Sequence, residues 1–353
     1  MIRAIPMNIK KFLILTASFF ISVAALFFFV RATRDTVMVS STRFLMGTVV
    51  EIKSPAASVE ERKRAQDAIE KAFKEISRVE GVFSTFKIDS EISRINRETV
   101  NGPVKTTDEV LGLVERSIEF NKKTEGAFDI TVKPLVELWR HARASQRLPT
   151  DVELKSALGR IGSKHISINR ADKTIEFTIY GMAIDLGGVA KGYATSQAVR
   201  VLKECGIQNA IVNSGGDMYC LGMRSPASQW RVGIQHPRNK NKIFAELKLK
   251  DMAIDTSGDY EKFFTLEGKR YSHIIDPRTG YPIGDDTVSS TIIAKDPAVA
   301  DMMATSMCVL GLKGLKIVNG MDGIDAIIIK NNNGVLEMLA SAGIERKYDI
   351  VKK

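Results

Sequence analysis

Short apolar segments that come in closely spaced pairs, joined by glycine-containing turns, constrain this fold more than any other feature. Asn209–Ser214 is apolar, Gly215-Gly216-Asp217 is a turn, and Met218–Leu221 is the partner segment. Further strands are predicted at 45–53, 166–169, 174–179, 230–235, 243–250, 252–256, 271–275, 288–295, 325–330 and 335–340. Hairpin-linked strands pair antiparallel, whereas a doubly wound parallel sheet needs a crossover between its strands. The pattern therefore predicts an α+β fold with mixed or antiparallel sheets and flanking helices.

Helical segments are indicated by capping residues followed by apolar positions at three- and four-residue spacing. The first capping box, Ser58-x-x-Glu61, precedes such a series, which consists of Ala65, Ile69, Ala72, Phe73, Ile76 and Val79. Boxes of the same kind, Thr106-x-x-Glu109 and Thr150-x-x-Glu153, open two other helices. The remaining helices are predicted over about 188–204, where Gly206 ends the segment, and after Pro297.

The N-terminal segment differs from the rest of the chain. Residues 1–11 carry basic side chains and no acidic ones, and Phe12–Val30 then runs nineteen residues without a charge. A helix of that length spans roughly 28 Å, close to the ~30 Å hydrocarbon core of a membrane. We expect a cytoplasmic segment over 1–11, a transmembrane anchor over 12–30, a linker over 31–43, the main domain over 44–345 and a tail over 346–353. A cleaved signal peptide is the alternative, although no Ala-x-Ala site follows the run.

The formal net charge of +10 raises the question of a nucleic-acid partner. The basic residues are scattered, no run reaches five, and no nucleic-acid-binding module pattern occurs, which argues against one. A basic surface suits an anionic membrane face or an anionic substrate equally well. Cys205, Cys220 and Cys308 are widely spaced, so free thiols are favoured over a disulfide, and a thiolate metal site is not expected.

Two segments have the composition of an anion site and a metal site. In Asp185–Gly192, glycines stand where a strand leads into a helix, whose first N–H groups favour an anion, and Lys191 adds a positive charge. In Ala300–Thr305, Asp301 and Thr305 share one helix face and offer oxygen ligands that suit Mg²⁺ or Ca²⁺. Each pattern also has an ordinary structural explanation: a helix start in the first case, and in the second a solvated aspartate with a core-facing threonine.

Two other regions offer a base and a ring-binding surface. Tyr271–Gly280 places His273 near Asp276, and a strand there followed by a turn would expose Arg278. His273 is a candidate general base, and a structural histidine is the alternative. Gly126–Thr131 and Phe83–Phe86 combine small residues with aromatic ones and could hold a planar ring, or serve as turn and core.

The residues of several short segments, and the order of these segments along the chain, carry a family resemblance. They are Met46-Gly47-Thr48, Ser84-Thr85-Phe86 with Asp89-Ser90-Glu91, Gly126 to Thr131 with Pro134-Leu135, Asp185 to Gly192, Val212 to Asp217, Trp230 to Ile234, Thr256 to Tyr260, His273 to Gly280 and Ala300 to Thr305. Over roughly residues 42 to 340 the chain resembles the ApbE family, the FAD:protein FMN transferases formerly called thiamine biosynthesis lipoproteins.

The resemblance implies a duplicated T-fold-like architecture and a set of site residues. The FAD contacts it implies are Met46, Phe86, Ala127, Phe128, Asp129, Asp185, Lys191 and Ile275. The Mg²⁺ ligands it implies are Asp301, Thr305 and the backbone carbonyl of Gly188. His273, with Asp276 nearby, falls where a proton acceptor is expected. One departure concerns Ala304, because family members often carry a serine or aspartate there that can join the metal ligands.

The function implied is Mg²⁺-dependent transfer of the FMN half of FAD to a threonine hydroxyl of another protein, with release of AMP. Family acceptors carry an Asp-Gly-x-Thr-Ser/Thr-type segment and include subunits of membrane redox complexes. This chain has no such segment, which favours the role of enzyme over that of flavinylated carrier. A Mg²⁺-dependent FAD pyrophosphatase and a non-catalytic FAD-binding protein are the alternatives. The expected location is a bacterial inner membrane, spanned once, with the catalytic domain on the periplasmic side.

Overall fold

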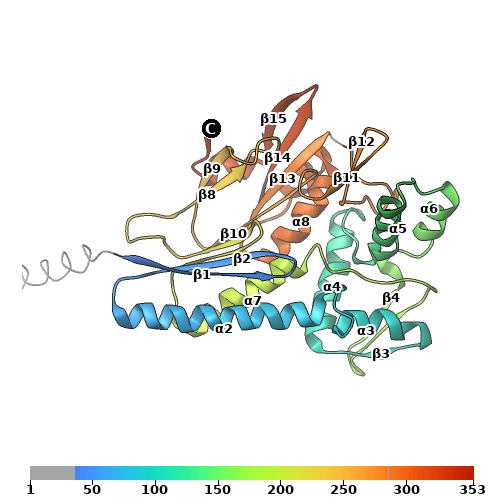
Figure 1. Cartoon of the computed structure of the whole chain (residues 1–353), viewed down its shortest axis with the longest axis horizontal. Coiled ribbons are helices and arrows are strands. Elements are labelled where there is room, and N and C mark those ends of the chain that lie inside the picture. Colours follow the sequence, from blue (N-terminus) through green and yellow to red (C-terminus); the bar gives the residue numbers. More distant parts are fainter. Residues whose placement is uncertain (1–35, 285) are drawn as a thin grey trace, which may run out of the picture.

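An eight-stranded sheet forms the centre of the molecule (Figure 1). The computed structural model describes residues 36–284 and 286–353. In spatial order the strands are β1 (Val37–Leu45), β2 (Thr48–Ala56), β6 (Ala210–Ser214), β7 (Asp217–Leu221), β10 (Met252–Gly258), β13 (Thr287–Ala294), β14 (Ile324–Asn332) and β15 (Val335–Ala340). Every neighbouring pair is antiparallel. The predicted α+β class is therefore confirmed.

Helices cover one face of this sheet and a smaller sheet covers the other. The helical layer is built on α2 (Val59–Phe83), α7 (Ala190–Glu204) and α8 (Pro297–Leu310), which pack against one another and against the strands. On the opposite face, β8 (Trp230–Gln235) and β9 (Ile243–Leu249) bury a second apolar core. Successive residues of a strand point to opposite faces. Ala253 belongs to the helical core and Ile254 to the other core, so residue 255 is directed toward the helices.

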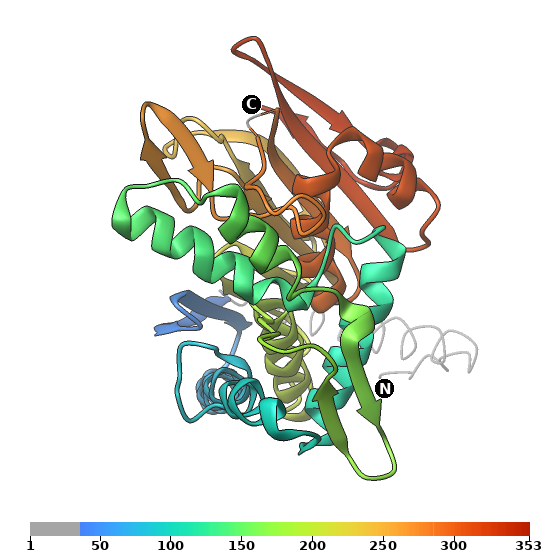
Figure 2. The ribbon, with the colours of Figure 1, turned by 90° about the vertical axis from the view of Figure 1, so that its right-hand side faces the viewer.

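Most of the remaining elements surround one end of the helical layer (Figure 2). They are α3 (Glu91–Glu98), β3 (Val104–Lys105), α4 (Asp108–Lys123), α5 (Lys133–Ser145), α6 (Asp151–Leu158), β4 (Ile166–Asn169), β5 (Thr174–Phe177), β11 (Phe263–Leu266), β12 (Lys269–Ser272) and α9 (Leu312–Asn319). The other two lie on the opposite face of the sheet, where α10 (Ala342–Lys347) packs into the second core and β16 (Val351–Lys352) pairs with β9. Trp139 of α5 stacks on Tyr271 of β12, which holds the β11–β12 hairpin against that helix.

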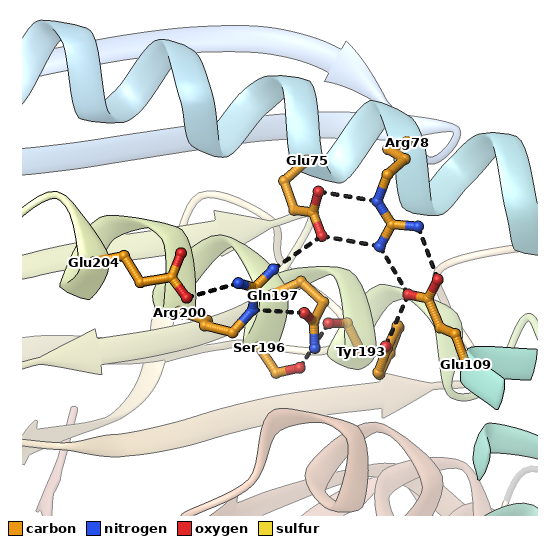
Figure 3. Close-up of polar contacts among 8 residues, drawn as sticks. All are labelled: Glu75, Arg78, Glu109, Tyr193, Ser196, Gln197, Arg200 and Glu204. Carbon is orange, nitrogen blue, oxygen red and sulfur yellow. Dashed lines mark hydrogen bonds and ion pairs between the residues drawn. The ribbon is translucent and has the colours of Figure 1, made fainter.

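A network of ion pairs joins three helices on the outside of the helical layer (Figure 3). Arg78 of α2 bonds Glu75 on its own helix and Glu109 of α4. From α7, Tyr193 donates to Glu109 and Arg200 pairs with Glu75. These contacts fix the relative positions of α2, α4 and α7.

Several predicted boundaries are wrong in detail. Residues 37–43 of the predicted linker are strand instead, because the chain from Val37 onward pairs with β2 as strand β1. The helix predicted from Thr106 is capped by Thr107, whose hydroxyl accepts from the backbone of Val110. The tail over 346–353 includes β16, which pairs with β9 and holds the C-terminus against the body.

The segment predicted as a strand over 271–275 is also different. Strand β12 ends at Ser272, and Asp276 begins a turn in which its carbonyl accepts from Gly280. Pro277 has no N–H to donate to a strand partner, which favours the turn. His273 therefore lies in a loop, while Arg278 is exposed as predicted.

The predictions for the cysteines and for the membrane anchor differ in whether the described residues include them. All three cysteines are free; Cys220 and Cys308 are buried, and Cys205 is half-buried. The anchor predicted over 12–30 lies outside the described residues. Within the described part, the helices are too short or too polar to cross a membrane.

Candidate active site

Three buried carboxylates and one lysine meet beneath the helical layer. Asp217 begins β7, Asp255 lies within β10, and Asp301 lies in α8. These residues are at most 4% exposed, and one oxygen from each lies within 4.8 Å of the others. Lys191, in the first turn of α7, forms an ion pair with Asp217, and its Nζ lies 3.4 Å from Asp301 Oδ1. We call Asp217, Asp255 and Asp301 the carboxylate cluster.

The packing of the elements explains why these residues converge. Strands β7 and β10 are antiparallel neighbours with Met218 opposite Ile254, so the next pair in register is Asp217 with Asp255. The start of α7 lies against the start of α8 at Gly192, where a Cβ would overlap the carbonyl oxygen of Pro297. Because Gly192 permits this approach, its N–H donates to Asp301 Oδ2 at 2.9 Å. The glycine thus fixes one carboxylate of the cluster.

The electrostatics of the cluster are those of a site with too much negative charge. Burial and repulsion from Asp217 and Asp301 raise the pKa of Asp255 well above its ordinary value. Burial also raises the pKa of Asp301 to about 6, although Lys191 opposes the change. Burial acts to lower the pKa of Lys191, but the carboxylates outweigh it and hold that pKa above its ordinary value. With all three carboxylates ionised, one ammonium leaves two negative charges unbalanced.

The residues expected to bind a metal lie beside the cluster. Thr305 lies one helical turn after Asp301. A Cβ built on Gly188 would come within 3.4 Å of Thr305 Oγ1 and 3.2 Å of the Phe128 ring, so these three residues are in contact range. The structure therefore brings together Gly188, Asp301 and Thr305, the predicted metal residues, with Phe128, a predicted flavin residue.

The other residues expected to contact FAD fall into two groups. Met46 lies in the β1–β2 turn with φ +54°, Phe86 is 87% exposed, and Asp185 accepts from Thr85 and from the Gly187 N–H. These side chains or their loops reach solvent. The second group is buried or internally bonded: Ala127 and Phe128 are in the core, Asp129 accepts from Thr131 and Ser163, and Ile275 packs in the α5 core.

His273 is held by one backbone carbonyl. Its Nδ1 lies 2.9 Å from the oxygen of Lys262, which can only accept, so Nδ1 carries the proton and Nε2 is the free acceptor. Desolvation by the surrounding protein lowers the pKa of His273 to about 4, although the side chain is exposed at the surface. Asp276 bonds the backbone and guanidinium of Arg278. No hydrogen bond joins Asp276 to His273 in the described part of the chain.

Three acidic residues of this region were not predicted as site residues. The sequence pattern indicates a turn at Asp217 and a strand at Asp255, and neither pattern by itself predicts a site residue. An aspartate inside an apolar strand is itself a signal, because such residues are almost never fully buried without a partner. Glu261 is the third: its side chain is exposed at the surface, yet desolvation by the surrounding protein raises its pKa to about 7, and the charges of Asp217 and Asp301 add to that effect while Lys191 opposes it.

Together, the fold and the site define an α+β protein in which a lysine at a glycine-rich helix start lies beside three buried carboxylates whose oxygens are close enough to hold a cation. The model of the ApbE family matches residues 46–328, and the chain belongs to that family.

Similar proteins come from several bacteria. The FAD:protein FMN transferase of Vibrio cholerae is 33% identical over 84% of this chain and 89% of its own length. The protein of the same name from Escherichia coli is 32% identical over 84% and 85%. Among solved structures, the flavin transferase ApbE from Vibrio cholerae superposes with a TM-score of 0.78 at 31% identity, covering 88% of this chain and 99% of that one. The ApbE protein of Thermotoga maritima gives 0.79 with the same identity and coverage.

Proposed function

We propose that this chain is an FAD:protein FMN transferase that uses Mg²⁺ to move the FMN half of FAD onto a threonine of another protein. The observation that carries the proposal is the convergence of Lys191, Asp301 and Thr305 beside the Gly187–Gly188 helix start. The names of the relatives support the same reaction.

The residues present fit a magnesium ion. The available donors are oxygens of carboxylates, a hydroxyl and a backbone carbonyl, which are the ligands that Mg²⁺ prefers. Both carboxylate oxygens of Asp255 are buried without a hydrogen-bond partner, and the cluster carries excess negative charge. Asp301, Thr305 and the Gly188 carbonyl would hold the ion. When bound, it supplies neutralisation of phosphate charge and orients the phosphate oxygens.

The protein's own residues supply binding and proton transfer. At the start of α7, Lys191 supplies the positive charge for the FAD phosphates. The N–H groups of Gly187, Ala190 and Gly192 already donate to Asp185, Leu186 and Asp301, so the helix start itself contributes less to anion binding than its sequence suggests. His273 Nε2 accepts the proton of the threonine hydroxyl, because the low pKa leaves the imidazole neutral at pH 7. The threonine oxygen forms a bond to the FMN phosphorus, and the bond from that phosphorus to the oxygen of the AMP phosphate breaks.

The test of the function is to incubate the purified chain with FAD, Mg²⁺ and an acceptor peptide that contains an Asp-Gly-x-Thr-Ser segment. Mass spectrometry of the peptide should show the added mass of FMN, and AMP should appear in equal amount. Free FMN with an unmodified peptide would instead indicate the FAD pyrophosphatase, and intact FAD would indicate a binding protein.

We also propose that residues 12–30 anchor the enzyme in a bacterial inner membrane, with the catalytic domain on the periplasmic side. The uncharged length of that segment and the basic residues before it support this orientation. Acceptors would then be proteins whose target threonine faces the same side, such as subunits of membrane redox complexes. The intact mass of the mature protein distinguishes a retained anchor from a cleaved signal peptide.

A further inference from the structure

Asp255 is the one member of the carboxylate cluster whose charge has no partner. Asp217 pairs with Lys191, and Asp301 accepts from the Gly192 N–H and faces the same lysine. Both oxygens of Asp255 are buried without a hydrogen bond, and its side chain is 2% exposed. An ionised carboxylate in such a position costs several kcal/mol unless a cation or a proton compensates it.

The surroundings of Asp255 favour a cation. Oxygens from three separate elements, β7, β10 and α8, converge within 4.8 Å of one another, an all-oxygen set of the kind that binds hard divalent ions. A single proton on Asp255 would still leave one unbalanced negative charge beside Lys191. One divalent cation brings the three carboxylates and the ammonium to neutrality.

We propose that Asp217, Asp255 and Asp301 together bind a divalent cation in the protein before any nucleotide is present, with Asp255 as the ligand delivered from the sheet. Asp301 is shared with the ligand set of the proposed transferase, so this inference deepens that function and rests partly on it. The addition is a ligand set that lies below α8, on the sheet side, and includes two carboxylates not counted among the expected metal ligands. Cation binding then requires neither FAD nor Thr305.

The experiment titrates Mn²⁺ into the full-length chain without nucleotide and follows free Mn²⁺ by electron paramagnetic resonance. The wild type should bind one ion, and Asp255→Asn should weaken that binding at least tenfold, as should Asp217→Asn. Thr305→Val should change the affinity less than about twofold. As a matched control, Asp325→Asn alters another buried aspartate, one that pairs with Lys347 away from the cluster, and should leave Mn²⁺ binding unchanged.

Equal Mn²⁺ affinity of Asp255→Asn and wild type would overturn the proposal and leave a proton shared between Asp255 and Asp217 as the explanation. Loss of binding in Thr305→Val alone would overturn it too, because the ion would then depend on the other ligand set. If Asp255→Asn does not fold, Asp255→Ser is titrated in its place. A second measurement then follows the melting temperature of the wild type, which should rise when Mn²⁺ is added. The absence of a rise would count against the proposal. Because FAD is absent, a wild type that binds Mn²⁺ but transfers no FMN would refute the function and leave this site standing.

Discussion

Helix α7 takes part in two clusters of charged side chains, and the two differ in how their charges are matched. Along its outer side, the network of Figure 3 surrounds each carboxylate of Glu75 and Glu109 with arginine or tyrosine donors. At its start, Lys191 faces three carboxylates and contacts two. Bonds from Arg78 lower the pKa of Glu75 and of Glu109, whereas burial raises that of Asp255 and of Asp301.

The difference in how the charges are matched suggests a different role for each cluster. The outer network is satisfied by the protein alone, so its contribution is to hold helices together. The carboxylate cluster is unsatisfied in the chain by itself, and an unmet buried charge is tolerated where a ligand completes it. Under the proposal, the same residue types serve structure in one place and binding in the other, and the two clusters differ in the number of hydrogen-bond donors that each carboxylate has.

The largest effect is expected from Asp301→Ala. This change removes the carboxylate that belongs both to the expected metal ligands and to the cluster. Loss of several kcal/mol of phosphate-charge stabilisation should lower the transfer rate about 10³-fold or more. The measurement is FMN added to the acceptor peptide per minute, with Asp325→Ala as the buried-aspartate control. Undiminished transfer by the wild type in EDTA would contradict the metal's role.

Replacement of the proposed base should have the next largest effect. His273→Ala should slow transfer by about 10²- to 10⁴-fold, the usual contribution of a general base, and change FAD affinity little. Stopped-flow rates and fluorescence titration with FAD separate the two quantities. A rate equal to that of the wild type would assign the proton to another group.

The pH dependence gives an independent check on His273. Its pKa of about 4 lies below the ordinary value, so the imidazole is neutral and able to accept a proton at every pH above that value. With Mg²⁺ and FAD held at saturating concentration, so that protonation of Asp301 does not limit metal binding, the transfer rate should stay level from about pH 8 to about pH 5 and fall only as the pH approaches 4. An inflection near 6.5 that disappears in His273→Ala would show that the pKa is not lowered.

The fold could be predicted from the sequence more completely than the carboxylate cluster could. Alternating apolar strands between glycine turns, such as 230–235, are local patterns, and that strand was predicted with its observed bounds. Asp301 and Thr305 are recognisable as a candidate pair because their spacing lies within one helix, and the family resemblance favours them as metal ligands over the ordinary structural explanation. Asp255 was not, because its lack of a partner depends on the register of β7 with β10 and on the packing of α8, both of which join residues far apart in the chain. His273 is recognisable from sequence as a candidate base, but the loop around it is not. The alternating residues over 271–275 predict a strand, whereas β12 ends at Ser272 in the structure.

Removal of the unmatched charge should stabilise the protein when no metal is present. Asp255→Asn keeps the shape of the side chain, and its amide can donate to the neighbouring carboxylates. We expect an increase of about 1–4 kcal/mol in the free energy of unfolding in EDTA, by analogy with the gain seen when buried charged groups are replaced by uncharged residues of similar size. Urea unfolding followed by tryptophan fluorescence measures the change. The advantage should shrink or reverse when Mn²⁺ is added, and a variant less stable than the wild type in EDTA would mean that Asp255 is already compensated.

The smallest effect is expected in the outer network. Arg78→Ala removes the donor shared by Glu75 and Glu109, but Arg200 still contacts the first and Tyr193 the second. The Arg78 side chain is 44% exposed, so water screens its ion pairs, and we expect a loss of only about 0.5–1 kcal/mol in the free energy of unfolding. Mn²⁺ affinity and the transfer rate should stay within about twofold of the wild type, since the change lies on the outer side of α7. A large loss of either would mean that the two clusters communicate along that helix, and the division between a structural and a binding cluster would have to be abandoned.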